Sequence, residues 1–191
     1  MSFFIQISCI FVIGCSFGWL LEVIFRRFCR SSNPDGRWIN PGYLKGPWLP
    51  IYGFGLCTLY LLSGVENLLP IGGVLGKLIL IIIMTFSVTL LELIAGFIYI
   101  DLLKTDLWDY SNEWGNFRGL ICPRFVFFWG IICAIYVLFV HNFIVLFANW
   151  ILGHAGFSIF AGIYLGLMLA DTLGLNMSRR KVFHKSSIQP K

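Results

Sequence analysis

The feature that most constrains this chain is its series of long apolar segments. Several reach about twenty residues, the length that an α-helix needs to cross the hydrocarbon core of a bilayer. The chain is 58% hydrophobic and 12% charged, whereas a soluble domain carries about 25% charged residues. We therefore predict an all-α, polytopic helical membrane protein, multi-pass in the cell membrane, with about five transmembrane helices. The segments are Phe3–Phe25, Leu49–Ser63, Leu75–Leu102, Phe125–Val140 and Gly156–Leu175.

A further apolar stretch, Phe143–Ile151, is too short to span a bilayer. We interpret it as a short interfacial or re-entrant helix, and a sixth, tilted span is the alternative. The first segment has neither a basic start nor a small-residue cleavage site. It is therefore expected to be a retained helix and not a removed signal peptide.

The basic residues predict the orientation of the chain. With five spans, the loop 26–45, the loop 104–124 and the C-terminal tail share one side and hold all the Lys and Arg residues except Lys77. Cytoplasmic loops carry such an excess, so we expect the N-terminus outside and the C-terminus in the cytoplasm. The net charge of +5 then reflects topology, and no nucleic-acid partner is predicted. We expect one helical transmembrane domain, 1–177, followed by a basic cytoplasmic tail, 178–191.

The loop Asn40–Gly53 cannot be ordinary helix, because it carries three prolines and three glycines in fourteen residues. Irregular backbone at a membrane boundary is tolerated only where protein or a watery cavity covers it. We predict that this loop roofs a polar pocket on the cytoplasmic side. Its structural residues are Gly42, Gly46, Pro47, Pro50 and Gly53.

Among the acids within the apolar segments, Glu22, Glu92 and Asp171 are candidates for a polar site. A carboxylate at such depth costs a few kcal/mol and normally faces a partner or a cavity. Glu22 could instead form only a packing pair with Arg26 four residues later, and Asp171 could snorkel or cap. The predicted substrate-binding residues are Glu22, Arg26, Asn40, Lys45, Tyr52, Glu92, Asp109, Tyr110, Asn116, Arg118 and Arg124.

The cysteines and glycines have a simple structural interpretation. Most cysteines fall inside apolar segments without a Cys-x-x-Cys pair, so we expect buried apolar residues and no metal site. Small residues recur every four positions at Gly14 and Gly18, and again from Gly162 to Gly174. Such rows let helices approach closely. We favour packing within one chain over a dimer interface.

The polar motifs together resemble a known family. Two motifs are the most specific, namely Gly-Pro-x-x-Pro-Ile-Tyr-Gly over 46–53 and Trp-Asp-Tyr-Ser over 108–111. The other residues that contribute to the resemblance are Gly18-Trp19, Glu22, Asn40, Gly42, Leu44, Glu92, Gly96, Asn116, Gly119, Cys122 and Trp129-Gly130. This set is similar to the bacterial membrane proteins called putative ABC-transporter type IV, or CmpB-like, which also have eukaryotic relatives. The resemblance covers about Phe3–Gly130 and departs at the longer loop Cys29–Trp38, where Asn33-Pro34-Asp35-Gly36 indicates a turn.

The resemblance implies a permease-like protein of the bacterial inner membrane. It also implies a shared polar site of Glu22, Asn40, Gly46, Pro47, Pro50, Tyr52, Glu92, Asp109, Tyr110 and Asn116. Our first hypothesis is therefore a transport permease or a permease subunit. The sequence has no Gly-x-x-x-x-Gly-Lys-Ser/Thr motif. Any ATP would then be hydrolysed by a separate ATPase subunit, and a chain this small would form a homo-oligomer or need such a partner.

Two other classes stay open. A membrane-embedded enzyme could use the acids for proton transfer and the basic residues to hold a phosphorylated lipid. However, no catalytic motif is recognised and no catalytic residue is assigned. A small membrane scaffold or regulator is the second alternative. No cofactor is predicted, and the substrate, its direction of movement and the energy source do not follow from the sequence.

Overall fold

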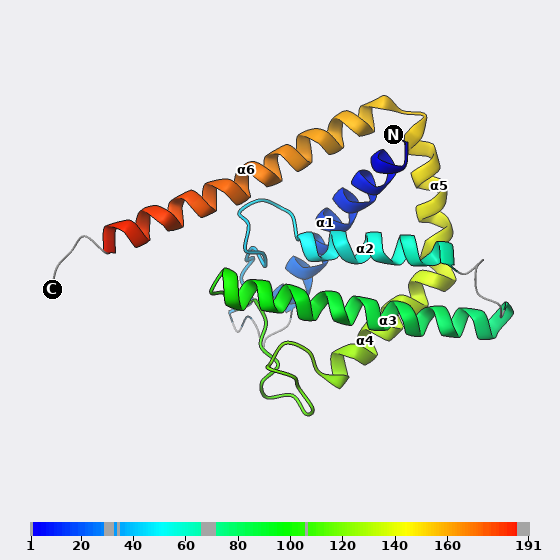
Figure 1. Ribbon diagram of the computed structural model, residues 1–191, viewed down its shortest axis with the longest axis horizontal. Coiled ribbons are helices and arrows are strands. Elements are labelled where there is room, and N and C mark those ends of the chain that lie inside the picture. Colours follow the sequence, from blue (N-terminus) through cyan, green and yellow to red (C-terminus); the bar gives the residue numbers. More distant parts are fainter. Residues whose placement is uncertain (1, 29–32, 34, 66–71, 106, 187–191) are drawn as a thin grey trace.

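The computed structural model describes residues 2–28, 33, 35–65, 72–105 and 107–186, with side chains described as far as Gly174 except for that of Leu102. The regular structure in this part of the chain is helical, as predicted (Figure 1). The helices are α1 (Ser2–Phe28), α2 (Pro50–Ser63), α3 (Gly73–Phe97), α4 (Pro123–Ile135), α5 (His141–Leu152) and α6 (Ala155–Ser186), with π-helical turns at Ile98–Leu102 and Tyr136–Val140.

Four described helical stretches are long and apolar enough to cross a membrane, namely Ser2–Phe28, Gly73–Asp101, Pro123–Leu152 and Ala155–Gly174. The protein is therefore a multi-pass membrane protein. α2 is apolar but has 14 residues, which gives it a length of about 21 Å at 1.5 Å per residue. That is shorter than the bilayer core of about 30 Å. A fifth crossing at α2 stays a prediction.

The structure corrects the expected separate helix over 143–151. α4, the π-helical turn and α5 follow one another without a loop from Pro123 to Leu152. Neither Gly nor Pro occurs from Ile131 to Leu152 to interrupt the helix. The path bends at the π-helical turn, so that α5 leaves in a different direction from α4 (Figure 1). The short segment is thus the second half of one helical stretch.

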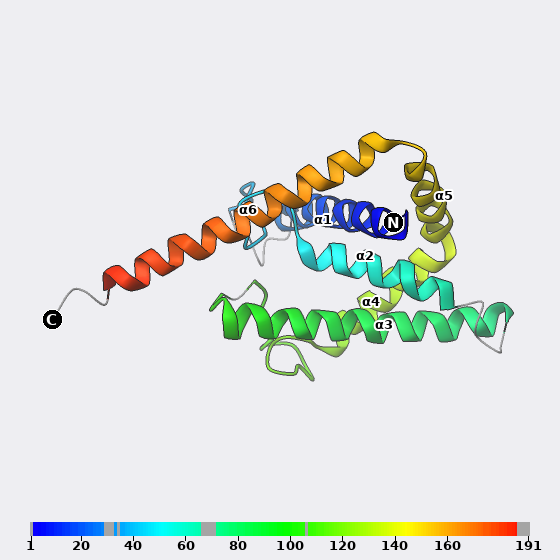
Figure 2. The ribbon, with the colours of Figure 1, turned by 45° about the horizontal axis from the view of Figure 1, so that its top comes forward.

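The helices alternate in direction along the chain. In both views of the ribbon, α1, α3 and α6 run toward the left, whereas α2 runs back toward the right (Figures 1 and 2). The C-terminal ends of α1 and α3 and the start of α2 therefore lie toward the same end of the molecule. The loops that carry most basic residues begin or end there. α6 extends away from the other helices beyond this end.

α1 and α2 cross closely because glycines face each other at the contact. A Cβ on Gly14 would lie 2.8 Å from the Cα of Gly53, and one on Gly53 would lie 2.8 Å from the carbonyl oxygen of Phe11. A Cβ on Gly18 would lie 2.2 Å from the ring of Tyr52. The predicted packing of the first glycine row within the chain is confirmed.

The second glycine row behaves differently. A Cβ at Gly162, Gly166 or Gly174 would meet nothing within 4 Å. This face of α6 therefore does not pack against another described part of the chain, contrary to the expectation for this row.

The stretch predicted to be irregular over Asn40–Gly53 is so only as far as Leu49, because Pro50–Gly53 forms the first turn of α2. The loop before α2 is partly covered by protein. Leu44, Trp48 and Leu49 are buried, and the Leu49 amide donates to the Cys15 carbonyl of α1 at 3.1 Å. Leu44 and Trp48 share a core cluster with side chains of α1, α5 and α6. Pro50 then begins α2 at a position where its missing N–H costs no hydrogen bond. The loop thus ties the N-terminal helices to α6.

The cysteines are packed as the sequence predicts. Those that the structure describes are free and buried, at positions 9, 15, 57, 122 and 133. Cys29 lies outside the described residues. The turn expected at 33–36 also forms, since the Gly36 amide donates to the Asn33 carbonyl at 3.0 Å and Gly36 has a φ of 57°.

Candidate functional site

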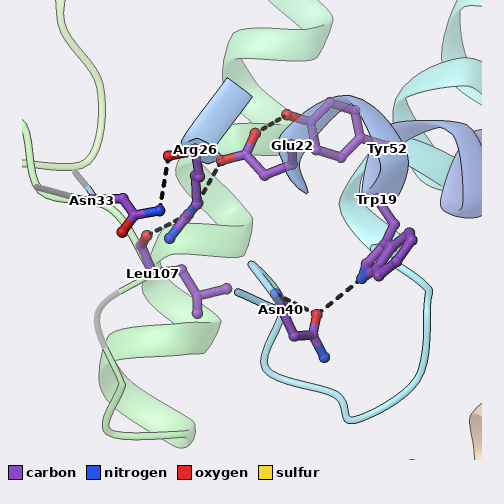
Figure 3. Close-up of polar contacts among 8 residues, drawn as sticks. Trp19, Glu22, Arg26, Asn33, Asn40, Tyr52 and Leu107 are labelled. Carbon is purple, nitrogen blue, oxygen red and sulfur yellow. Dashed lines mark hydrogen bonds and ion pairs between the residues drawn. The ribbon is translucent and has the colours of Figure 1, made fainter. Parts of the chain in front are cut away.

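Glu22 of α1 is the centre of the first polar group (Figure 3). Arg26 Nε–H donates to Glu22 Oε1 at 2.8 Å, and the Tyr52 hydroxyl donates to Glu22 Oε2 at 2.9 Å. Arg26 also donates to the Leu107 carbonyl at 3.1 Å, so α1 contacts the loop that follows α3. Asn33 donates to the carbonyl of Arg26 at 3.1 Å. The expected helical pair Glu22–Arg26 is therefore one part of a contact among α1, α2 and two loops.

Glu92 of α3 is the centre of the second polar group. Its side chain is buried, with 4% of its surface exposed. The Tyr110 hydroxyl donates to Oε1 at 3.1 Å, and the Trp129 indole N–H donates to Oε2 at 2.8 Å. Trp129 belongs to α4 and Tyr110 to the loop before α4. Glu92 thus joins α3 to α4 and to the Trp-Asp-Tyr-Ser motif.

Tyr52 lies between these two groups. Its hydroxyl is bonded to Glu22, and its side chain lies near Glu92 and Tyr110. Gly18 permits this position, because the Tyr52 ring occupies the space that a Cβ on Gly18 would need. Tyr52 is thus bonded to one of the two carboxylates, that of Glu22, and lies near the other.

The position and the pKa of the loop residue Tyr110 depend on Phe125 and Glu92. Its ring stacks on Phe125 of α4, with ring centroids 4.2 Å apart. Burial raises the pKa of Tyr110, and the Glu92 carboxylate, which its hydroxyl contacts, raises the pKa further. Tyr110 is therefore a neutral hydroxyl at physiological pH, able both to donate and to accept a hydrogen bond.

Asp109 and Asn116 shape the loop and do not reach the carboxylates. Asp109 is exposed and accepts from the Ser111 amide at 2.8 Å and from the Ser111 hydroxyl at 2.5 Å. These hydrogen bonds lower the pKa of Asp109. Asn116 donates to the carbonyls of Ser111 and Glu113 at 3.0 and 2.9 Å. Both predicted site residues hold the loop that presents Tyr110.

Asn40 has the same role in the loop before α2. Its amide donates to the carbonyls of Leu44 and Lys45 at 2.8 and 3.0 Å. Its oxygen accepts from the indole of Trp19 at 2.9 Å (Figure 3) and from the Gly42 amide at 3.2 Å. These contacts fix the loop against α1. Its side chain is thereby fully used in local structure.

Asp171 of α6 binds this loop from the other side. Its Oδ2 accepts from the amides of Lys45 and Gly46 at 2.8 and 3.0 Å, and from the Trp48 indole at 3.1 Å. Tyr164 adds a hydrogen bond to the Pro47 carbonyl at 3.3 Å. Asp171 thus caps the loop backbone, and the side chain of Lys45, which is exposed, is not what binds it.

The basic residues predicted for the site are dispersed. Arg26 lies beside Glu22, whereas Arg124 is exposed and pairs with Glu113 at 2.8 Å. Arg118 is exposed and lies over the ring of Phe97, 5.6 Å from its centroid. Of the predicted residues, the structure brings together Glu22, Arg26, Tyr52, Glu92 and Tyr110. It leaves Lys45, Arg118 and Arg124 apart from them.

A hollow of about 570 Å³ lies on α3 and α4, and neither carboxylate lines it. Its lining is apolar apart from Thr85 and Thr89. Both hydroxyls donate to carbonyls of their own helix, at 2.7 and 2.8 Å. The carboxylates are instead engaged by hydrogen bonds, so the polar pocket expected from the sequence stays a proposal.

Sequence reasoning missed two indoles. Trp129 and Trp19 were not predicted as site residues, although each donates its N–H to a polar group of the site. A buried Trp usually finds a hydrogen-bond acceptor, and this tendency is the signal that could have included them. Within the described residues, no three His, Cys, Asp or Glu side chains group closely enough to hold a metal ion.

These features define a polytopic helical membrane protein in which carboxylates on the helices hold separate helices and loops together. The chain belongs to the family described as "Putative ABC-transporter type IV" (ABC_trans_CmpB), whose model matches residues 9–174. The resemblance inferred from the motifs is thus confirmed, and it extends beyond Gly130 into α6. No curated protein and no solved structure matches the chain significantly.

Proposed function

We propose that the protein is a transport permease or a permease subunit, with its polar centre at Glu22, Tyr52, Glu92 and Tyr110. Membership of the family supports a transport role. The observation that carries the proposal is the burial of the Glu92 carboxylate within the candidate span Gly73–Asp101, where Tyr110 and Trp129 donate hydrogen bonds to it. Acids within a span are costly and typically mark ion or substrate pathways.

The arrangement of this centre also fits a moving protein. Glu22, Tyr52 and Glu92 come from α1, α2 and α3, and Tyr110 comes from a loop. A change in any of these hydrogen bonds would therefore alter the contact between two elements. Permeases need this coupling, because binding at the centre must shift helices relative to one another.

The proposed orientation places the centre toward the cytoplasmic leaflet. The basic loops next to it support this orientation through the positive-inside rule. The sequence contains no P-loop motif, so ATP hydrolysis would need a separate subunit. We accordingly propose either an ATPase partner or a homo-oligomer that forms a complete pathway.

The proposal is tested by measuring small molecules inside and outside cells that lack the gene. Cells complemented with the wild-type protein are expected to restore the distribution that deletion changes. Glu92→Gln should fail to restore it, because it removes the buried charge at nearly constant volume. Asp35→Asn is the matched control, since Asp35 is exposed and pairs only with Arg37 at 3.4 Å among the described residues.

Full complementation by Glu92→Gln would contradict the permease proposal. It would favour a scaffold if changes at Gly18 abolished function at the same time. Lipid profiles of the same strains separate the enzyme alternative. A lipid that changes on deletion and stays changed with Glu92→Gln, without any change in solute distribution, would favour an enzyme.

A further inference from the structure

Glu92 has an unusual set of partners for a buried acid. Glu22 has the guanidinium of Arg26 at 2.8 Å, which balances its charge. Glu92 is 4% exposed, and its hydrogen-bond partners among the described residues are the neutral side chains of Tyr110 and Trp129. The two carboxylates of the centre therefore differ: one is compensated by a cation and the other is not.

The burial of Glu92 raises the free energy of its charged form relative to that of its protonated form. An unpaired buried carboxylate is disfavoured where water is excluded, and binding a proton removes that penalty. Hydrogen bonds from Tyr110 and Trp129 stabilise the charged form and so oppose the penalty. A group with these opposing influences can exchange a proton without a change of fold.

The geometry indicates which oxygen takes the proton. Oε2 faces the Trp129 indole at 2.8 Å, and an indole N–H can only donate. Oε2 must therefore remain an acceptor in both states. Oε1 faces the Tyr110 hydroxyl at 3.1 Å, which can turn from donor to acceptor. A proton on Oε1 would then donate to the Tyr110 oxygen.

Two other titratable groups lie near Glu92 and Tyr110. They are Tyr52 on α2 and Cys122 at the start of α4. The Tyr52 hydroxyl contacts Glu22, which is paired with Arg26. Each acid is thus contacted by one tyrosine hydroxyl, Glu92 by Tyr110 and Glu22 by Tyr52.

A metal cation fits this site less well than a proton. Hard cations need several oxygen ligands, whereas the described groups bonded to Glu92 are directed at it as donors. We infer that Glu92 reversibly binds a proton at Oε1 and that the proton is the coupling ion of transport. The coupling role rests on the proposed permease function, whereas proton binding by itself does not.

The test is an infrared pH titration of the full-length protein in liposomes, with the glutamate carboxyl carbons labelled with ¹³C. The wild-type spectrum minus that of Glu92→Gln should contain the C=O band of one protonated glutamate that disappears as the pH rises. The wild-type spectrum minus that of Glu22→Gln should lack this band. Trp129→Phe should move the band to higher wavenumber, because the carbonyl Oε2 loses its donor.

Trp114→Phe is the matched control for the indole, since Trp114 is 86% exposed and should leave the band unmoved. The inference is overturned if the band persists in Glu92→Gln or does not respond to Trp129→Phe. Should Glu92→Gln fail to fold, the labelled wild-type and Trp129→Phe proteins decide the question. If proton binding is present but the small-molecule distribution restored by the wild-type protein does not depend on the pH gradient across the membrane, the coupling role fails while the binding site stands. The permease proposal is then decided separately, by the complementation test with Glu92→Gln.

Discussion

At the scale of single residues, acids of similar type occupy different environments in this protein. Glu92 is buried between neutral donors, Glu22 is paired with Arg26, and Asp109 is exposed at a turn. Their chemistry follows from these surroundings more than from their identity. Single substitutions, each compared with a control substitution at a nearby residue, can therefore separate the roles of these acids.

Gly18→Ala is expected to destabilise the protein by about 1–3 kcal/mol, as overpacking does. The added Cβ would lie 2.2 Å from the Tyr52 ring, so the ring must move away from Glu22. Thermal unfolding in detergent measures the loss. Gly55→Ala is the control on α2, because a Cβ there meets nothing within 4 Å. Equal unfolding temperatures for the two variants would contradict the proposed close contact.

Asp109 is expected to stabilise its turn at neutral pH and to lose this effect in acid. Hydrogen bonds from Ser111 lower the pKa of Asp109. The stabilisation is therefore complete above the ordinary pKa of about 3.9 and is lost as the pH falls through the lower folded value. Asp109→Ala should lose it at every pH.

Hydrogen exchange at the Ser111 amide, corrected for its intrinsic pH dependence, checks the prediction for Asp109. The exposed neighbour Asn112 provides the control variant Asn112→Ala, which should leave the protection of Ser111 unchanged. Unaltered protection in Asp109→Ala would count against the assigned role.

At the scale of elements, one carboxylate holds α6 to the loop before α2. Little of the apolar part of Ala155–Gly174 is buried, and its packing is confined to one face, where Ala161 and Tyr164 join the core cluster. Asp171 and Tyr164 provide its polar contacts with the loop. The attachment of α6 therefore depends on few residues.

Asp171→Ala is expected to release the loop from α6. The amides of Lys45 and Gly46 would lose their acceptor, which corresponds to about 1.5–3 kcal/mol for a hydrogen bond to a charged group. Faster hydrogen exchange at these amides would show the release. Thr172→Ala is the matched control, because Thr172 bonds only within α6, to the Met168 carbonyl at 2.8 Å. Unchanged exchange in Asp171→Ala would refute the role of this carboxylate.

At the scale of the whole molecule, the number of crossings depends on α2. If α2 crosses the bilayer, the chain has five spans and its ends lie on opposite sides; if it does not, four spans leave both ends on one side. The short length of α2 argues for four spans, and the distribution of Lys and Arg argues for five. The alternating directions of the helices also fit five (Figures 1 and 2).

We expect the N-terminus outside and the C-terminus in the cytoplasm. Reporter fusions at the two ends that are active on only one side of the membrane measure this directly. Reducing the bias by changing Arg26, Arg27 and Arg37 to neutral residues should weaken the preference for this orientation. Finding both ends on the same side would show that α2 does not cross the bilayer.

Much of the fold follows from local pattern. Apolar runs near twenty residues predict the long helices, Pro50 and Pro123 mark the starts of α2 and α4, and Gly14 with Gly18 predicts a close helix contact. The continuous stretch from α4 to α5 was missed, because a polar pair at His141-Asn142 resembles a boundary although nothing there breaks the helix.

The candidate site, like the fold, could be predicted from the sequence only in part. The sequence alone determined that acids lie inside apolar helices, because their cost is a property of the residue and the solvent. The spacing of four residues also indicated Arg26 as a partner of Glu22. Only the tertiary structure decided the partners of the other two acids: neutral donors for Glu92 and loop amides for Asp171. Those partners are 18 to 126 residues away along the chain. Contacts over such separations depend on how helices pack, which no local pattern specifies.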